Sequence, residues 1–183
     1  MLEALTNLIR ENAGDTIINN PAIPNERNEE AVQDAGNSVV SSLQNALSGG
    51  NVKDVMKIFS GRTESTNPVV QDATSNLTQR LSGNYGVDRT QASGIAGSLI
   101  PTILSQLAGK TADPSNSTFN IQDIFNKLTG GKTSGVNIES IFNKFKAGLD
   151  TDQDGDVDLS DLTGLLTGGQ GGSLMDKVKG MFK

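Results

Sequence analysis

The 183-residue chain contains no cysteine, no histidine and no tryptophan, and aromatic residues make up only 4% of it. Without cysteine, it can form no disulfide, no thiolate metal site and no cysteine nucleophile. Without histidine, a catalyst would need carboxylates, lysine, serine or the single tyrosine in a pocket that the sequence does not reveal. We therefore predict that the protein is not an enzyme.

Long apolar runs and strongly basic segments are missing as well. No stretch approaches the roughly 18 to 20 apolar residues of a membrane span, so we expect no transmembrane segment. No basic stripe is interleaved with aromatic residues, which argues against nucleic acid as a partner. The first ten residues, MLEALTNLIR, do not form a secretory signal. The default compartment is the cytoplasm, and export is not excluded because a removed signal would not be seen.

The negative net charge of −6 is concentrated in one short segment. Residues 150–161, DTDQDGDVDLSD, contain six aspartates, and the other 15 acidic residues of the chain balance its 15 basic residues. The excess charge therefore belongs to a single site, which indicates a bound cation rather than a generally acidic surface.

Apolar residues recur at helical spacing along almost the whole chain, and no run alternates with period two. We therefore predict an all-α fold, a compact bundle of amphipathic helices whose core is built mainly from Ile, Leu, Val and Ala. Cap and stop signals place the helix boundaries. The first helix spans 2–12, and later helices begin near Asn25, Asn51, Asn67-Pro68 and Asp88 and end near Gly49, Gly61 and Gly83-Asn84, with Pro101 inside the last of them.

Three short segments resemble one another: residues 51–61 (NVKDVMKIFSG), 120–130 (NIQDIFNKLTG) and 137–148 (NIESIFNKFKAG). The first two each follow a long amphipathic helix, which favours a duplicated long-helix/short-helix unit. The alternative is that short helices with Asn caps and Gly stops simply look alike. The predicted organisation is an N-terminal helix and loop (1–25), a duplicated helical body (26–134), an EF-hand-like unit (135–167), and a Gly-rich linker with an amphipathic helix (168–183).

Residues 85–108, YGVDRTQASGIAGSLIPTILSQLA, resemble the bacterial YidB-like family of uncharacterised helical proteins. That family has a Gly-Val-Asp, Gln-Ala, Leu-Pro-x-Leu-Leu pattern before a Gly- or Ala-rich break, and Ile100-Pro101 stands here where Leu-Pro is usual. The resemblance covers about residues 31–130. It implies a helical fold and no chemistry, because the family has no assigned activity.

Residues 150–161 match the loop of an EF-hand, in which positions 1, 3, 5, 7, 9 and 12 surround the ion and position 6 is glycine. Gly155 makes the sharp turn and Val157 occupies the aliphatic position 8. Side-chain oxygens come from the first three aspartates, a backbone carbonyl from the fourth, and the fifth acts directly or through water. The predicted calcium ligands are Asp150, Asp152, Asp154, Asp156, Asp158 and Asp161.

The flanks of the loop agree with this interpretation, because an amphipathic helix over 137–149 leads in and 159–166 can begin the outgoing helix. The alternative is an Asp-rich solvated turn whose last aspartate caps a helix. Six crowded carboxylates would repel one another strongly without a cation, and a cap needs no alternating register.

Asp161 departs from the usual pattern, in which a glutamate at position 12 chelates calcium through both oxygens. The shorter side chain predicts lower affinity and some competition from Mg²⁺. The segment DGDVDLSDL is similar to half of a dockerin module, but dockerins carry two such loops, so cohesin binding is not carried over.

A single loop leaves Val157 without the partner that paired EF-hands provide. It either packs on the helical body, so that the ion is a structural staple, or pairs with a second copy of the chain. The expected function is that of a calcium-binding structural or interaction protein, in which the ion staples or switches a helical assembly surface. The alternative is a calcium sensor that docks a separate protein or membrane.

The last eleven residues, 173–183, place five apolar side chains on one helical face, with three lysines among the polar positions. A Gly-rich linker, 168–172, tethers this segment, which we call the C-terminal tail. It can dock on its own body, on a neighbouring subunit or on an anionic membrane surface. Protein docking is favoured, because so short a segment with three lysines binds membranes weakly.

Overall fold

The computed structural model describes residues 2–113 and 116–146, and this part of the chain is helical with no strand. The prediction of an all-α bundle is therefore confirmed. A π-helical turn, η1 (Gly14–Ile18), and two 3₁₀ turns, η2 (Asn25–Arg27) and η3 (Ser117–Phe119), connect the helices. The α-helices are α1 (Leu2–Asn12), α2 (Asn28–Ser48), α3 (Val52–Phe59), α4 (Pro68–Tyr85), α5 (Arg89–Ala112), α6 (Ile121–Leu128) and α7 (Ile138–Lys146).

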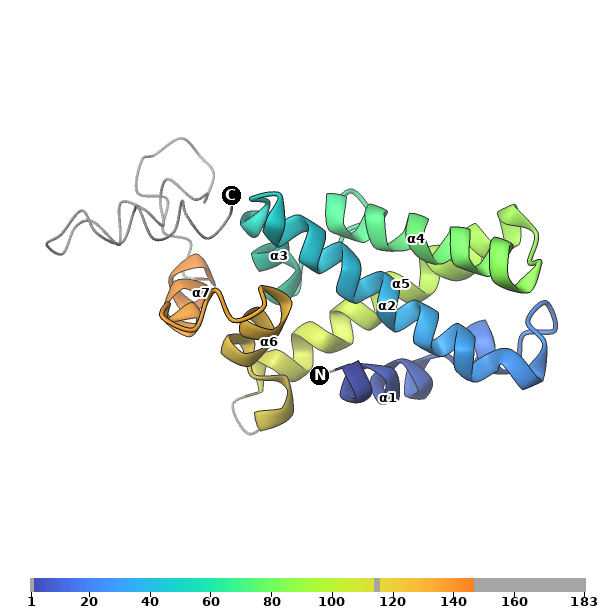
Figure 1. The fold of residues 1–183 in the computed structure, drawn as a ribbon, viewed down its shortest axis with the longest axis horizontal. Coiled ribbons are helices and arrows are strands. Elements are labelled where there is room, and N and C mark those ends of the chain that lie inside the picture. Colours follow the sequence, from blue (N-terminus) through green and yellow to red (C-terminus); the bar gives the residue numbers. More distant parts are fainter. Residues whose placement is uncertain (1, 114–115, 147–183) are drawn as a thin grey trace, which may run out of the picture.

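Four helices form the main body, in which α2 and α5 run in one direction and α1 and α4 return in the other (Figure 1). Helix α4 packs against both α2 and α5, and α1 packs against the same two long helices. The three short helices α3, α6 and α7 gather at the end of the body where α2 and α5 finish (Figure 1). Helix α7 lies outermost and contacts α6.

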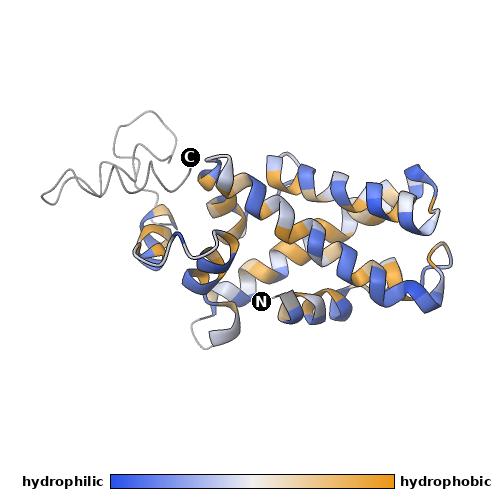
Figure 2. Cartoon of the chain, viewed as in Figure 1, coloured by the Kyte–Doolittle hydropathy of each residue, from blue (hydrophilic) through white to orange (hydrophobic). Residues whose placement is uncertain are grey.

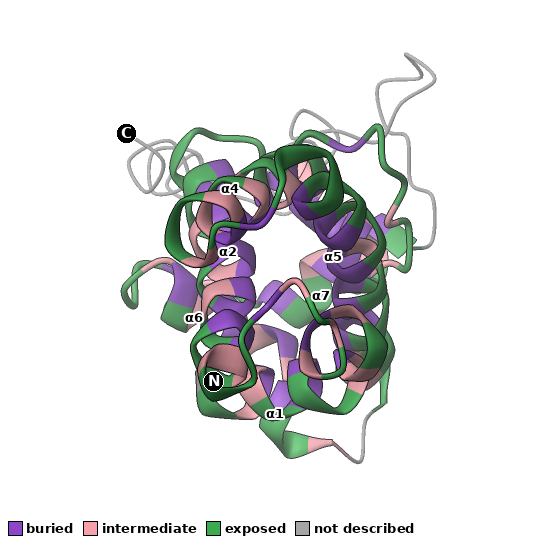
Figure 3. Ribbon diagram, turned by 90° about the vertical axis from the view of Figure 1, so that its right-hand side faces the viewer, coloured by how far each residue is buried: buried purple, intermediate pink, exposed green. Residues whose placement is uncertain are grey.

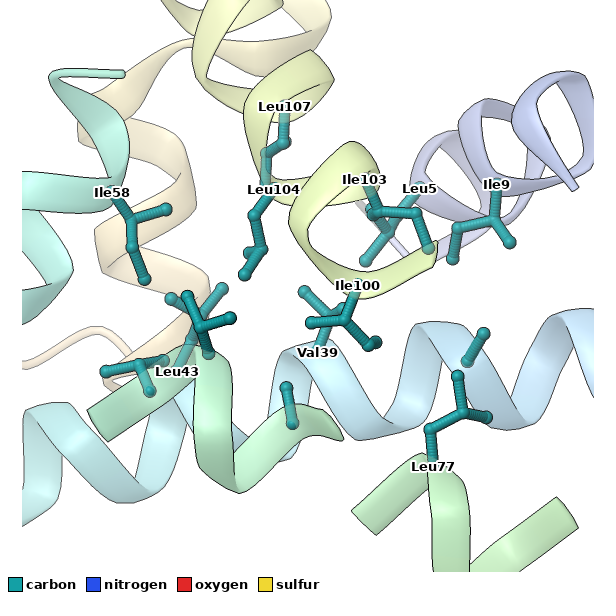
Figure 4. Close-up of a cluster of buried hydrophobic side chains, with 14 of the residues drawn as sticks. Leu5, Ile9, Val39, Leu43, Ile58, Leu77, Ile100, Ile103, Leu104 and Leu107 are labelled. Atoms are coloured by element: carbon teal, nitrogen blue, oxygen red, sulfur yellow. The ribbon is translucent and has the colours of Figure 1, made fainter. Parts of the chain in front are cut away.

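The core is made almost entirely of aliphatic side chains. Figure 4 shows side chains of α1, α2, α3 and α4 converging on α5, which presents four of the labelled residues along one face. Apolar positions face inward and polar positions outward on each helix (Figure 2), and the end-on view shows the same division in burial (Figure 3). The fully or almost fully buried residues of this group include Leu5, Ile9, Val39, Leu43, Ile58, Leu77, Ile100, Ile103 and Leu104.

Side chains that accept backbone N–H groups begin several helices. The Asn67 Oδ1 atom accepts the N–H of Val69 at 2.9 Å, with Pro68 in the first turn, and Asp88 Oδ1 accepts the N–H of Thr90 at 2.9 Å. Both starts were expected, because these side chains satisfy donors that have no partner within the helix. Asn51 precedes α3 but makes no such side-chain bond.

Two helix boundaries differ from the expected ones. Helix α2 begins at Asn28 rather than directly after Asn25, because residues 25–27 form the 3₁₀ turn η2. Helix α4 continues past Gly83 to Tyr85 and ends at Gly86, whose φ of 69° lies in the left-handed region. Glycine adopts that conformation at little cost, so the stop signal is the later glycine.

The three similar segments contact one another in series, α3 with α6 and α6 with α7. Helix α3 follows the long helix α2, and α6 follows the long helix α5 after η3. The rings of Phe59, at the end of α3, and Phe125, in α6, lie 5.8 Å apart between centroids at an interplanar angle of 51°. Both side chains are 1% exposed, so this tilted aromatic pair joins α6 to α3, which in turn packs on α5. The duplication itself stays an interpretation.

We predict that Phe59 and Phe125 contribute jointly to stability. Each single change to leucine should lower the free energy of unfolding by about 1–2 kcal/mol. The double variant should lose about 0.5–1.5 kcal/mol less free energy of unfolding than the sum of the two single losses, because the aromatic contact can be lost only once. Urea unfolding of the four chains measures this coupling. Leu77→Val combined with Phe125→Leu is the control pair, and its two losses in free energy of unfolding should add. If the losses of Phe59→Leu and Phe125→Leu add equally well, the prediction is wrong.

Candidate metal centre

Helix α7 precedes the acidic loop, and its sequence explains where it begins and which face it buries. The Asn137 Oδ1 atom accepts the N–H of Ser140 at 2.8 Å, so Asn137 caps the first turn. Ile138, Phe142 and Phe145 are buried at 4–7% exposure, as the helical spacing of these apolar positions predicts. The expected leading helix is therefore present over Ile138–Lys146.

The six predicted ligands, Asp150, Asp152, Asp154, Asp156, Asp158 and Asp161, lie outside the described residues, so the calcium centre stays a prediction. The donor set suits a hard divalent cation, because carboxylate oxygens are the ligands that calcium and magnesium prefer. Within residues 2–113 and 116–146, no group of three or more acidic residues could hold a metal ion. The described helices thus offer no competing metal site.

Two side chains at the N-terminus of α6, those of its cap Asn120 and of Gln122, hold the start of α7. The Gln122 Oε1 atom accepts the N–H of Ile138 at 2.8 Å, and Asn120 Nδ2 donates to Glu139 Oε1 at 2.7 Å. The same Asn120 side chain caps α6, since its Oδ1 accepts the N–H of Gln122 at 2.8 Å. The N-terminal turns of the two helices are therefore coupled through side chains, which sets the direction in which α7 leaves the body.

The connection between α6 and α7 is closed by a buried threonine. Thr133 is completely buried, and its hydroxyl donates to Asn126 Oδ1 at 2.7 Å. Gly130 and Gly131 precede it with φ of 63° and 86°, which only glycine adopts without strain. The connection is thereby fixed to α6 by internal hydrogen bonds rather than by solvent.

A cleft of about 970 Å³ lies between the end of α5, η3, α6 and α7, and we call it the α6–α7 cleft. Its lining includes the acidic residues Asp113, Asp123 and Glu139 and one basic residue, Lys146, which is the last residue of α7. The Lys146 ammonium lies 5.5 Å from the centroid of the Phe142 ring. The cleft is thus acidic and adjoins the point from which the chain continues toward the predicted calcium loop.

The sequence did not reveal this cleft, because its lining comes from four segments whose packing no local pattern predicts. The one sequence feature that could have indicated it is the number of asparagines near the short helices. Capping already explains these residues, since Asn116, Asn120 and Asn137 each accept a backbone N–H of a following turn.

A second polar group, the Asp34 cluster, joins α2 to the end of α4. The Asp34 carboxylate accepts bonds from Arg80 at 2.8 Å, Asn84 at 2.9 Å and the Tyr85 hydroxyl at 2.9 Å. The Arg27 guanidinium stacks over the Tyr85 ring at 4.4 Å and donates to the Asn84 carbonyl. Three donors from α4 therefore converge on the Asp34 carboxylate of α2, so the cluster connects these two helices.

Burial and the neighbouring Asp34 carboxylate both raise the pKa of Tyr85 above its usual value. Burial contributes most, because the charged phenolate loses hydration, and the hydrogen bond and charge of Asp34 oppose ionisation further. At the surface between α1 and α2, the hydrogen bond from Arg10 lowers the pKa of Glu29. This pair is exposed and contributes little to stability.

The chain matches no known family model, no curated protein sequence and no solved structure. The resemblance to the YidB-like family therefore stays a prediction carried by residues 85–108. Among the described helices, none combines the length and the apolar character needed to cross a membrane.

We predict that Tyr85 ionises well above the ordinary tyrosine pKa of about 10 in the folded protein. Because the folded pKa is raised, the contribution to stability is present below the unfolded pKa and is lost as the pH rises through the folded pKa. Tyr85 is the only tyrosine and tryptophan is absent, so the absorbance of tyrosinate reports this group alone. Titration in denaturant should return the ordinary value.

The variant Asp34→Asn should lower the Tyr85 titration midpoint without fully restoring the ordinary value, since burial remains. Asp72→Asn, an exposed change on α4, is the matched control and should leave the midpoint unchanged. A folded protein whose tyrosine titrates at its ordinary pKa would contradict the arrangement around Asp34.

Proposed function

We propose that this protein binds one calcium ion in the loop 150–161 and acts as a non-enzymatic structural or interaction protein. The proposal is carried by the six aspartates at EF-hand ligand positions with glycine at position 6, in a segment that follows α7 in the sequence. The ion would staple or switch a helical assembly surface.

The proposed ligands have distinct roles. Asp150, Asp152 and Asp154 would supply side-chain oxygens and Asp156 its backbone carbonyl, while Asp158 would bind directly or through water. Asp161 would close the coordination sphere. Bound calcium would supply positive charge that removes the mutual repulsion of these carboxylates and fixes the direction of the chain after α7.

The attachment of α7 supports this proposal. Gln122 and Asn120 hold the first turn of α7, and Phe142 and Phe145 bury its inner face. An ion that orders residues 150–161 would therefore orient the following segment relative to a body that is already fixed. If α7 were loosely attached, ordering of the loop would not set the orientation of the following segment relative to the body.

A structural or assembly role is favoured over catalysis, because the clustered carboxylates would be committed to the ion and EF-hand cages leave few open positions for substrate. Val157 lacks a second loop to pair with, so it would either pack on the helical body, with the ion as a staple, or pair with a second copy of the chain. The amphipathic C-terminal tail favours a second candidate, a calcium sensor that docks a separate protein or membrane partner.

We predict stoichiometric calcium binding that depends on Asp150. Calorimetric titration of the wild type should show one ion bound per chain, and Asp150→Ala should abolish the binding because it removes the ligand at position 1. Light scattering at each step measures mass. A calcium-dependent rise in mass supports assembly, whereas binding at constant mass supports an internal staple or the sensor.

The control for this titration is Asp72→Ala, which removes one exposed carboxylate from α4 and should bind calcium like the wild type. The absence of calcium binding in the wild type would overturn the proposal and return residues 150–161 to a solvated acidic turn.

We further predict that Asp161→Glu tightens calcium binding by about tenfold, because the longer side chain can chelate through both oxygens at position 12. The same change should weaken competition by Mg²⁺, which prefers fewer protein oxygens in an octahedral arrangement. Competition titrations with both ions measure the effect. Unchanged calcium affinity in Asp161→Glu would show that Asp161 does not occupy the closing position.

A further inference from the structure

The α6–α7 cleft has a mainly polar lining with acidic side chains at its edge. Of its larger apolar lining residues, Val136 is partly exposed, whereas Ile121 of α6 and Phe142 of α7 are each only 5% exposed. Asp123 and Glu139 are exposed at its edge, and together with Asp113 and Lys146 they give the lining a net charge of −2. A matching occupant would have an apolar face edged by basic side chains.

The C-terminal tail of the same chain has this character. Its apolar residues follow the helical spacing i, i+1, i+4, i+7 and i+8, and its side chains carry a net charge of +2. The basic positions are Lys177, Lys179 and Lys183, with Asp176 as the one acidic residue, and the apolar positions are Leu174, Met175, Val178, Met181 and Phe182.

The length of the intervening chain permits this contact. Lys146 lines the cleft, so residues 147–172 have only to leave from its edge and return. An extended chain spans about 3.3–3.6 Å per residue, so 26 residues reach far beyond any part of the cleft even when they contain a turn or short helix. Covalent attachment also gives the tail an effective concentration of the order of millimolar, which a second molecule does not match in dilute solution.

We propose that the C-terminal tail, residues 173–183, docks in the α6–α7 cleft of its own chain. Its apolar face packs on the partly exposed Val136, and its lysines approach Asp123 and Glu139. The docking is independent of the proposed calcium site, since its contacts involve none of residues 150–161. It places the tail on α6 and α7 rather than on a membrane, where so short a segment binds weakly.

The absence of cysteine makes a direct test possible in the full-length protein. A nitroxide attached through Ser173→Cys broadens the NMR signals of amides that lie near the tail. Docking should cause loss of signal at Asp123, Glu139 and Asn143 but not at Gln79 on α4. The measurement is made with excess calcium and again after chelation. Signal loss at the cleft in either condition supports docking, and its absence in both overturns it.

Charge reversal tests whether the acidic rim holds the tail. Asp123→Lys with Glu139→Lys should weaken docking on the order of tenfold, because two opposite charges at the rim become like charges. The signal loss at Asn143 should shrink accordingly. The control, Glu11→Lys with Asp72→Lys, makes the same change in net charge with exposed residues of α1 and α4 and should keep the signal loss.

Two further outcomes would overturn the proposal. Equal signal loss in the reversed and control variants, with both still folded by circular dichroism, would show that the acidic rim is not recognised. Signal loss that occurs only when spin-labelled chains are mixed with separate isotope-labelled chains would assign the tail to a second copy.

Discussion

Burial of the apolar face of α5 is the constraint on which the rest of the structure depends. This helix contacts α1, α2, α3 and α4, and η3 leads from its end toward α6. Ile100, Ile103 and Leu104 are completely buried, although Pro101 interrupts the backbone hydrogen bonds in the same turn. Close packing of this face against aliphatic side chains of four helices offsets that loss, which explains how a core with few aromatic residues holds a 24-residue helix in place.

The end of the bundle formed by α6 and α7 depends on a few specific side-chain contacts. Helices α6 and α7 are too short to be stable alone, so they need side-chain contacts with the body and with each other. The Phe59–Phe125 contact attaches α6, and the Gln122 and Asn120 side chains then attach α7 through polar bonds at its first turn. Aromatic residues are scarce in this chain, and five of the six phenylalanines are buried in this part of the structure: Phe59, Phe119, Phe125, Phe142 and Phe145. The aliphatic body and the aromatic end are therefore packed in different ways.

How much the sequence could predict follows from the range of the interactions involved. Asn67 and Asp88 begin helices through bonds to the next few residues, and apolar spacing alone identified the buried faces of α2 and α5. The Asp34 cluster joins residues 46 to 51 positions apart, and the α6–α7 cleft draws on four segments, so no local pattern revealed either. The end of α4 was placed too early because Gly83 and Gly86 are both adequate stop signals. Packing of Tyr85 against Arg27 and Asp34 favours the longer helix.

The predicted calcium loop and the bundle differ in the partners that their sequences offer to carboxylates. In the described residues, carboxylates such as Asp34 and Glu29 have cationic or hydroxyl partners supplied by other helices. The six aspartates of 150–161 have no basic residue among them. An external divalent cation is the least costly partner for such a segment. Polar bonds hold the first turn of α7, and Phe142 and Phe145 are buried in its later turns. A cation bound in the proposed loop would therefore act next to a helix that is already fixed to the body.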